Sequence, residues 1–548
     1  SIEGAATSRT AYLSVSGSTL AAASGTAVVA AGTDLRFTAS NSQVIGAITR
    51  SSDAFIDLEL RNGSNWVLPA AGVAVNSQVD QLVNSNSTIA FAQPVGSSPV
   101  FQSLTVGNYR GINGTLVMNA AFVGAGAGDR LIIDGGTATG QTGIIVHALG
   151  NVAPTSGDGI GLIHAIHGGQ TDTGAFSLGR RVAGGAYEYG LYRGGASGAD
   201  DWFLRSTQAG GTGPDALPNL RPEVAVDTAL PAIASQYSMA ILGTHAERAA
   251  ARATQPGGHA SAAWARLFGE TGSQGSSGGN AATQLDRFLD NGPSYDIDLA
   301  GFQAGYDVLI SSPGEAVQNA IGFYVGSGQA RGSVDAVYGG TAGSVSMDAY
   351  SLGAYWTHSQ ASGLYIDTVL QGTFFTEASA SSVLGEELKS DGFGVNASLE
   401  AGYRFDLGGG WAIEPQAQLV YQRLSFDDGA DSFGSIHYDA ANDVLGGIGA
   451  RVSRAWRLES GPKLTGSARA SLWNAFGDGT EVAFADPSGA NAASFYSGLG
   501  GTSVQLDLDA SMAISDAVSL FVSGDYDVRV DGEQGHAVGG RIGFNVSW

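Results

Sequence analysis

An unbroken alternation between residues 393 and 406 constrains the fold of this chain more than any other feature. Every odd position is apolar, and every even position is small or polar. The apolar members are Phe393, Val395, Ala397, Leu399, Ala401, Tyr403 and Phe405. Successive side chains of a β-strand point to opposite faces, so the segment predicts a strand with one apolar and one polar face. Soluble strands commonly span about 5–6 residues, whereas a strand crossing a membrane needs about 9–11, so we predict a transmembrane β-barrel strand.

The same alternation recurs to the end of the chain. Twelve candidate strands begin near residues 262, 295, 317, 344, 363, 393, 411, 444, 463, 503, 518 and 537. The connections between them alternate long and short, as in outer-membrane barrels with long outer loops and short periplasmic turns. We expect long loops near 270–294, 328–343, 377–392, 427–443 and 477–501. The fold class predicted for this half is a 12-stranded antiparallel transmembrane β-barrel.

A helical segment precedes the predicted barrel. Pro222 and Glu223 suit a helix N-terminus, because proline needs no N–H there and a carboxylate favours the dipole. Helix formers continue to about Arg252, and Pro231 is expected to kink or divide the helix. The segment is too polar to face lipid. A 12-stranded lumen has room for one helix of about 10–12 Å diameter, so we expect the helix to lie inside the barrel.

The first 206 residues form short β-like pieces separated by small polar turns. Their spacing of loosely 20 residues favours a β-solenoid, although no strict repeat can be written down. Residues 207–220 are rich in Gly and Pro and are expected to form a flexible linker. The N-terminal half is therefore predicted to be a solenoid end.

Composition excludes several classes of function. The formal net charge of -24 opposes binding to nucleic acid, and the absence of cysteine excludes disulfides and thiolate metal sites. His164 and His167 are three positions apart, which places them on opposite faces of a strand and makes joint metal ligation awkward. No G-x-S-x-G or H-E-x-x-H motif is present. We therefore predict no enzyme, no cofactor and no metal site.

The chain starts Ser1-Ile2-Glu3-Gly4, without a basic region followed by an apolar core. Because a barrel protein must be exported, we interpret the sequence as a mature form or a fragment.

Several segments resemble the classical (type Va) autotransporters of Gram-negative bacteria, with a pertactin-like passenger end. The segments that carry the resemblance are the rung-like 60–66 with Trp66, 104–111 and 129–136 at the start of the autochaperone segment, 185–192 and 201–206 at its end, 264–269, 402–405 and 414–416 in the barrel, and the terminal Trp548. The resemblance covers roughly residue 50 to the end.

The resemblance implies four domains and a right-handed parallel β-helix before the barrel. Residues 1–99 would be a passenger remnant, 100–206 the autochaperone region, 207–260 the linker and pore-threading helix, and 261–548 the barrel. The implied function is export and display of the passenger at the cell surface, from the outer membrane, with a role in virulence. The implied partners are outer-membrane lipid, lipopolysaccharide, the β-barrel assembly machinery and periplasmic chaperones, with the chain itself a monomer.

The resemblance also implies site residues. Ile542, Phe544, Val546 and Trp548 would form the barrel assembly signal, and Tyr187, Tyr189, Trp202 and Leu204 would belong to the autochaperone. The ionisable residues expected to face the lumen are Glu400, Arg404, Glu414, Asp507, Asp525, Arg529 and Arg266. We interpret them as solvated or paired wall charges rather than as groups that cleave the passenger. Cleavage near Asn219 stays an alternative, although the family's paired-Asn junction is absent.

Three other functions remain open at this point. The passenger could itself be an adhesin or a hydrolase with the barrel as its anchor. The barrel could be a porin without a secretory role, or the chain could be a soluble β-sandwich.

Overall fold

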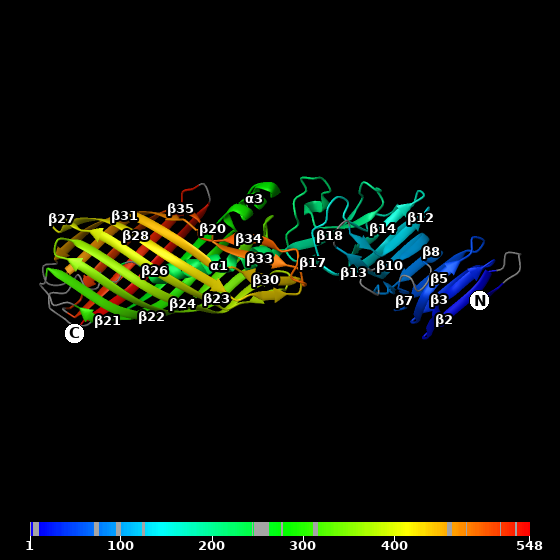
Figure 1. Ribbon diagram of the computed structural model, residues 1–548, viewed down its shortest axis with the longest axis horizontal. Coiled ribbons are helices and arrows are strands. Elements are labelled where there is room, and N and C mark those ends of the chain that lie inside the picture. The colour runs from blue at the N-terminus through cyan, green and yellow to red at the C-terminus, as the bar shows by residue number, and fades with distance from the viewer. Residues whose placement is uncertain are drawn as a thin grey trace. The chain divides into compact units, whose positions relative to one another are not determined.

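A computed structural model describes residues 2–547, except for 4–9, 71–75, 95–99, 123–125, 244, 246–261, 276–277, 311–315, 458–462, 478, 516 and 532–533. The chain divides into two compact units. The first comprises Ser1–Arg221 with Ala485–Ala492, and the second comprises Pro222–Phe484 with Ala493–Trp548 (Figure 1).

The second unit is a closed antiparallel barrel, and over the described residues it has twelve long strands. The strands are β20 (Ala262–Gln274), β21 (Tyr295–Ile310), β22 (Val317–Asp335), β23 (Thr341–Gln360), β24 (Leu364–Ser382), β26 (Gly392–Tyr403), β28 (Trp411–Phe426), β31 (Ala441–Arg457), β32 (Lys463–Ala475), β35 (Gly501–Ala513), β36 (Val518–Arg529) and β37 (Gly535–Ser547). The barrel closes between its first and last strands, where Ala262 pairs with Ser547 and Gln274 with Gly535. The twelve-stranded barrel predicted from the alternation is confirmed, and each strand begins within three residues of its expected start.

The two faces of the strands differ as the alternation predicts. In β26, Phe393 and Leu399 are 40% and 50% exposed, whereas Asn396 and Glu400 are only 1% and 2% exposed. The apolar side chains therefore point outward and the polar side chains point into the lumen. The same order holds in β37, where Ile542 and Phe544 are exposed and Asn545 is buried.

The long loops lie at the barrel end opposite the chain terminus, and they carry structure of their own. Helix α3 (Ala281–Asn291) lies between β20 and β21, and β25 (Glu387–Lys389) pairs antiparallel with β24. At the other end of the barrel, β27 (Phe405–Gly408) pairs antiparallel with β28. A separate small sheet contains β29 (Gly429–Asp431), β30 (Gly434–Tyr438), β33 (Thr480–Ala485) and β34 (Ala493–Ser497). The long loop expected at 328–343 is wrong, because β22 runs to Asp335 and β23 starts at Thr341, and their backbones stay paired in a glycine-rich stretch.

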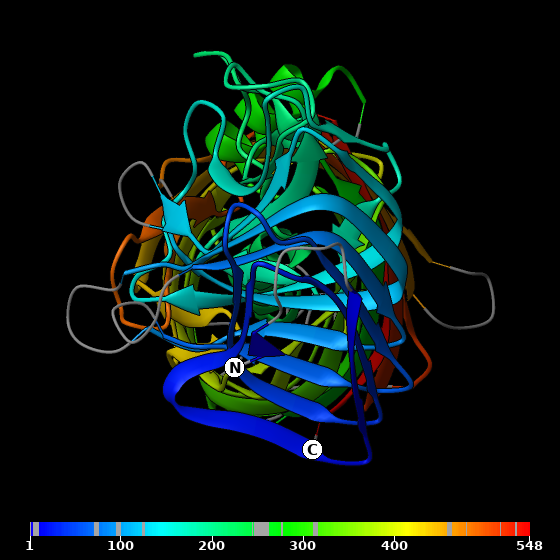
Figure 2. The same cartoon turned by 90° about the vertical axis from the view of Figure 1, so that its right-hand side faces the viewer.

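The first unit is built mainly from parallel strands that stack on one another (Figure 2). Its strands are β1 (Ile2–Glu3), β2 (Thr10–Ser16), β3 (Thr19–Ala31), β4 (Asp34–Ser40), β5 (Gln43–Arg50), β6 (Ile56–Arg61), β7 (Asn65–Leu68), β8 (Ser77–Ser85), β9 (Thr88–Phe91), β10 (Ser103–Ala121), β11 (Ala127–Gly128), β12 (Arg130–Asp134), β13 (Thr137–Leu149), β14 (Ile160–Ile166), β15 (Gln170–Thr171) and β16 (Phe176–Leu178). One row of pairings runs β2–β4–β6–β8–β10–β12–β14, and a second runs β3–β5–β7–β9–β10–β13. This pairing agrees with the predicted solenoid, whose right-handedness stays a prediction.

The spacing of the rungs is less regular than the expected 20 residues. Leu35 pairs with Ile56, 21 positions later, whereas Leu131 pairs with Ile163, 32 positions later. A buried column of apolar side chains, including Trp66 and Leu104, fills the interior. The indole N–H of Trp66 donates to the carbonyl oxygen of Gly46 at 2.9 Å, so a polar atom in this core is satisfied.

One corner of the solenoid repeats the same chemistry in successive rungs. Asn41, Asn62, Asn86 and Asn113 all adopt positive φ, between 45° and 55°. A serine follows each of the first three within two positions, and these serines form a ladder: the amide of Ser42 donates to Ser64 Oγ at 3.2 Å, and that of Ser64 to Ser87 Oγ at 3.1 Å. Asparagine tolerates this left-handed conformation better than most residues. The repeat that the sequence analysis could not write down is therefore a corner of Asn, or Asn-Gly, followed by Ser or Thr.

Antiparallel strands end the parallel stack. β19 (Trp202–Arg205) pairs antiparallel with both β14 and β18 (Tyr187–Arg193), and β17 (Val182–Gly184) pairs with β18. The following segment, expected to be a flexible linker, is held against β18. Thr207 bridges to Pro218 and Tyr187 to Leu220, and the short helix η1 (Gln208–Gly210) lies between them. Backbone hydrogen bonds thus order a stretch whose Gly and Pro content predicts mobility.

Two helices of the barrel unit complete the described elements. Helix α1 (Pro222–Leu242) lies inside the barrel, and α3 lies at the barrel end that carries the long loops. Among the described residues, no helix is both long and apolar enough to cross a membrane.

Candidate functional site

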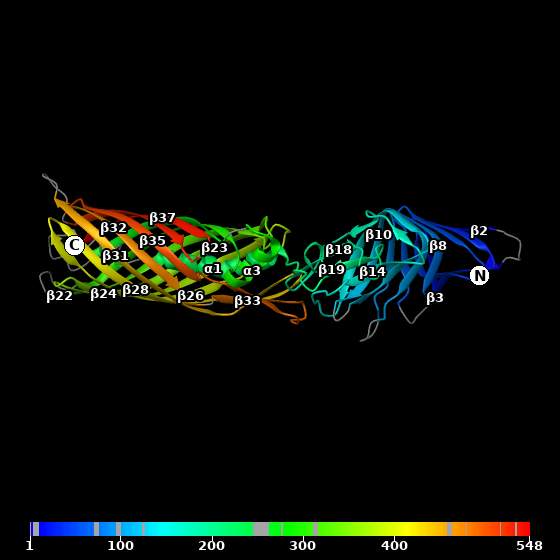
Figure 3. The same ribbon diagram turned by 90° about the horizontal axis from the view of Figure 1, so that it is seen from above.

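Helix α1 occupies the barrel lumen (Figure 3). It packs against β20 to β24, β26 and β28 of the wall and against β34 above it. Eighteen of its residues are buried, with apolar and small polar side chains on every side. A helix buried all round has no solvent-facing stripe, which is the pattern of an enclosed helix. The expected division is wrong, since α1 runs through Pro231 without interruption, while the expected kink stays a prediction. The expected extension to Arg252 lies largely outside the described residues.

Pro231 removes one backbone donor from the middle of α1. A proline nitrogen has no hydrogen to donate to the carbonyl four residues earlier, here that of Asp227. The hydroxyl of Tyr438, in β30, donates to this Asp227 carbonyl oxygen at 3.2 Å. Tyr438 is buried, and burial raises the pKa of its hydroxyl well above the usual value, so it stays a donor. A loop of the barrel thereby satisfies the carbonyl that proline leaves without its helical partner.

Side chains of the barrel wall bind the C-terminal end of α1. Carbonyl groups in the last turn of a helix lack intrahelical partners and carry the negative end of the dipole. The guanidinium of Arg266 donates to the Ile241 carbonyl at 2.8 Å, and Gln303 donates to the same oxygen at 3.1 Å. Gln371 and Asn396 each donate to the carbonyl of Ser238 at 3.2 Å. Arg266 thus stabilises α1, because a cation at a helix C-terminus interacts favourably with the helix dipole.

Glycines of β22 form the surface on which α1 lies. A Cβ atom added to Gly326 or Gly332 would come within 2.5 Å of the Ile241 or Ile233 side chain, respectively. A Cβ on Gly328 would come within 2.5 Å of the Tyr237 hydroxyl. Ile233, Tyr237 and Ile241 are four residues apart, so they form one face of the helix. Sequence analysis missed these glycines, although their inward register in the 317–335 strand is a visible signal.

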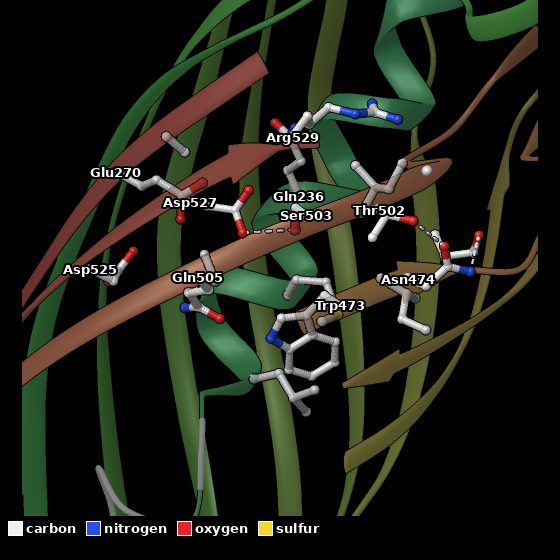
Figure 4. A pocket seen from close by; sticks show the side chains of 18 of the residues that line it. Gln236, Glu270, Trp473, Asn474, Thr502, Ser503, Gln505, Asp525, Asp527 and Arg529 are labelled. Carbon is white, nitrogen blue, oxygen red and sulfur yellow. Dashed lines mark hydrogen bonds between the residues drawn. The ribbon is translucent and has the colours of Figure 1, made fainter. Parts of the chain in front are cut away.

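A cavity of about 220 Å³, lined by charged, polar and apolar residues, lies beside another face of α1 (Figure 4). Gln236 and Met239 of the helix face it, and the wall contributes Glu270 and charged residues of β32, β36 and β37. Arg469 binds Asp507 through two hydrogen bonds of 2.9 Å. The Ser503 hydroxyl donates to Asp527 at 2.9 Å, as Figure 4 shows. The helix therefore fills the lumen unevenly: one wall contacts it closely, and the opposite wall keeps paired charges beside a space for water.

The structure places the predicted lumen charges as follows. Asp525 pairs with Arg541, Glu414 lies 3.6 Å from Arg451, and Arg529 lies 3.1 Å from Asp531. Tyr365 donates to Glu400 at 2.7 Å, and Arg404, at the end near the chain terminus, lies 3.0 Å from Asp406. Buried charges need such partners to offset the loss of hydration. These contacts favour the interpretation as paired wall charges.

Of the residues predicted for the autochaperone, three are buried in the antiparallel end of the solenoid. The indole N–H of Trp202 donates to Thr171 Oγ1 at 2.9 Å, and the hydroxyl of Tyr189 donates to the Ala153 carbonyl at 2.7 Å. Leu204 is fully buried, while Tyr187 is half-buried and bridges to Leu220. Together they cover the last parallel rung.

A short segment from the barrel sequence belongs to the first unit. Asp486 accepts hydrogen bonds from the amide of Val152 at 3.0 Å, from the amide of Ser488 at 2.8 Å and from the side chain of Asn491 at 3.0 Å. Burial opposes ionisation of this carboxyl, but the hydrogen bonds outweigh it and lower its pKa to about 2. Asp486 thus fixes the loop at Val152 as a charged acceptor at neutral pH.

The remaining predicted site residues belong to the terminal strand and to the proposed cleavage region. Ile542, Phe544 and Val546 lie on the outer face of β37, while Trp548 lies outside the described residues. The side chain of Asn219 accepts from Gln208 and donates to the Glu188 carbonyl, both at 3.1 Å. Self-cleavage at Asn219 would have to break these bonds first.

His164 and His167 bind different carboxylates. His164 lies 3.4 Å from Asp201, and His167 lies 2.6 Å from Asp134. Within the part of the chain that the structure describes, no three His, Asp or Glu residues gather in a way that could hold a metal ion.

Comparison with known families assigns both units. Residues 263–525 match the model of the autotransporter β-domain, and residues 77–191 match that of the type 1 autochaperone domain. The chain belongs to the autotransporters. Its barrel is accordingly an outer-membrane domain, with the passenger displayed at the cell surface. The autochaperone match ends before Trp202 and Leu204, so it does not include the strand that covers the last rung.

Curated relatives of this autotransporter are much longer. It is 31% identical over 65% of its length to the adhesin BmaC autotransporter of Brucella suis, of which it spans 11%. It is 28% identical over 73% of its length to the BrkA autotransporter of Bordetella pertussis, of which it spans 36%. Among solved structures, the transport unit of the Escherichia coli autotransporter AIDA-I aligns with 60% of this chain and all of that chain, at 19% identity and a TM-score of 0.48.

Proposed function

We propose that this chain is a translocator unit that anchors in the outer membrane and exports its own passenger to the cell surface. The observation that carries the proposal is the enclosure of α1 by the barrel. The helix directly follows the solenoid unit in sequence and occupies the lumen, as a chain that has passed through the barrel would. In this proposal residues 1–99 are a passenger remnant, 100–206 the autochaperone region, 207–260 the linker and helix, and 261–548 the barrel.

The physical account of export needs no nucleotide. A passenger that folds outside cannot return through a lumen that holds one helix. Parallel strands add to a folded edge, so the rung covered by β19 can nucleate those before it. Trp202 and Leu204 support that role because they bury the end of the stack.

The proposal also assigns partners. Ile542, Phe544, Val546 and Trp548 form a terminal strand that the β-barrel assembly machinery would read, and periplasmic chaperones would keep the chain unfolded before insertion. The barrel closes on itself, which supports a monomer. Its function is transport and display rather than chemistry.

The test is a chain given an export leader and an epitope tag at Thr10, produced in a Gram-negative outer membrane. We expect antibody to reach the tag on intact cells and the solenoid to resist protease. Trp202→Ala should leave the tag accessible but make the solenoid protease-sensitive, because the core loses a buried indole worth about 3–5 kcal/mol.

Tyr12→Ala is the matched control, because Tyr12 is 74% exposed and packs no core. A tag that stays inside the cell in the parent chain would overturn export. Unchanged protease resistance in Trp202→Ala would overturn the autochaperone role alone.

A second function is favoured by the names of two relatives, which are adhesins: BmaC and AIDA-I. The passenger of this chain would then attach cells to a surface, with the barrel as its anchor.

A further inference from the structure

An apolar groove interrupts the lipid-facing surface of the barrel. It has a volume of about 540 Å³ and lies across β26, β28, β31 and β32. Its walls are formed by Leu399, Leu419, Ile448, Leu472 and Phe476, all between 45% and 67% exposed. The groove is therefore lined by apolar side chains of the outer face.

A glycine on the outer face leaves room for the hollow, and a second glycine follows it in sequence. Gly446 lies on the outer face of β31, opposite Leu419, and a Cβ atom there would approach the ring of Phe476 to 3.1 Å. Gly447 faces inward, where the ring of Trp473 covers it; a Cβ atom would come within 2.7 Å of that ring. The indole thus lies on the lumen side of the barrel wall, beneath the groove.

A cation lies on the same strands, toward the loops. Arg423 is an exposed residue of β28, and its guanidinium donates to Asn442 Oδ1 at 2.9 Å. The hydroxyl of Tyr421 donates to the same oxygen at 2.8 Å. Arg423 is four residues beyond Leu419, which corresponds to about 13 Å along the strand.

The position of Arg423 corresponds to the outer edge of the membrane. Trp411 begins β28, with the guanidinium of Arg454 5.0 Å from its ring centre, and Tyr421 lies ten residues further along. At about 3.3 Å per residue and a tilt near 40°, this interval spans about 25 Å, which is the height of an apolar band between aromatic girdles. Arg423 then lies just beyond the band, at the depth of lipid phosphates on the loop side.

We propose that the groove and Arg423 bind one molecule of lipid A, the phosphorylated anchor of lipopolysaccharide. A phosphate group accepts hydrogen bonds from Arg423, and one acyl chain lies in the groove above Gly446. Guanidinium and phosphate match in charge and in bidentate geometry. The loop side of the barrel is the outer leaflet, where lipid A is the phosphate-bearing lipid. The site does not depend on passenger export.

The test is native mass spectrometry of the full chain in detergent with added diphosphoryl lipid A. We expect one retained lipid per chain. Arg423→Gln should weaken retention about tenfold, because a charge-assisted contact to phosphate is lost. Gly446→Leu should weaken it similarly by filling the groove, and heat-modifiable gel mobility checks that this variant is folded.

Arg454→Gln is the matched control, because it removes an outward arginine from the opposite edge of the band and should leave retention unchanged. Equal retention by the parent chain and Arg423→Gln would overturn the proposal, even if Gly446→Leu fails to fold. Equal retention of phosphatidylglycerol and lipid A by the parent would overturn the assignment to lipid A, and equal retention of a phosphate-free lipid would overturn the role of the cation.

Discussion

At the scale of single residues, the helix in the lumen depends on side chains that supply hydrogen bonds where its backbone lacks them. Pro231 deprives the Asp227 carbonyl of its helical donor, and Tyr438 donates instead. Arg266 and Gln303 do the same for the carbonyl of Ile241. A buried carbonyl without a donor would cost about 1–3 kcal/mol of stability, so each of these side chains helps to stabilise the helix.

Tyr438→Phe tests this directly. The substitution keeps the ring that packs 5.9 Å from Phe426 and removes only the hydroxyl. We expect α1 to lose about 1–3 kcal/mol of stability. The measurement is the urea midpoint for loss of heat-modifiable mobility. Tyr421→Phe, which removes an exposed hydroxyl bound to Asn442, should leave the midpoint unchanged; an equal shift in both variants would contradict the account.

At the scale of elements, the sequence predicts the strands but not the wall surface against which α1 packs. Alternation fixes which residues of a strand face lipid, and it located β26 and β37 well because one face must be apolar. The same rule cannot say which inward face contacts a helix. Glycines such as Gly326 and Gly332 are compatible with a water-filled lumen as well as with a lumen in which a helix packs against the wall. Likewise, the corner Asn-Ser pairs of the solenoid recur at uneven intervals, so a search for a fixed period overlooks them.

Gly332→Leu tests the packing of α1 against β22. An isobutyl group there would meet Ile233, and overpacking costs about 1–3 kcal/mol. We expect the amides of residues 222–242 to exchange hydrogen faster, measured by mass spectrometry. Gly372→Leu is the control, because Gly372 faces lipid and a Cβ atom there meets only ordinary contacts at 3.5 Å. Unaltered exchange in Gly332→Leu would show that the helix does not depend on this glycine.

At the scale of the whole molecule, the barrel is intermediate in size. Eight strands leave an interior filled by side chains, and sixteen to eighteen leave an aqueous channel. A twelve-stranded lumen lies between these sizes, and α1 occupies it. The sequence predicted the helix from its polarity and length, but not that it would lie against one wall and leave a cavity on the other.

Deletion of 222–242 should open the barrel. We expect single-channel conductance in planar bilayers to rise several-fold over the intact chain, because the aqueous cross-section increases once the helix is gone. Deletion of 281–291, which removes the loop helix α3, is the control and should leave the conductance unchanged. An intact chain that already conducts as much as the deletion would favour the porin alternative.

The corner ladder of the solenoid has a consequence for how such surface proteins change over generations. Ser64 accepts a hydrogen bond from the amide of Ser42, and its own amide donates to Ser87 Oγ, so the ladder links each rung to the rungs next to it. If one rung were duplicated or lost in the gene, the rungs on either side could still pair through the same serine contacts. Recombination can therefore lengthen or shorten the displayed stalk while the membrane anchor is inherited intact.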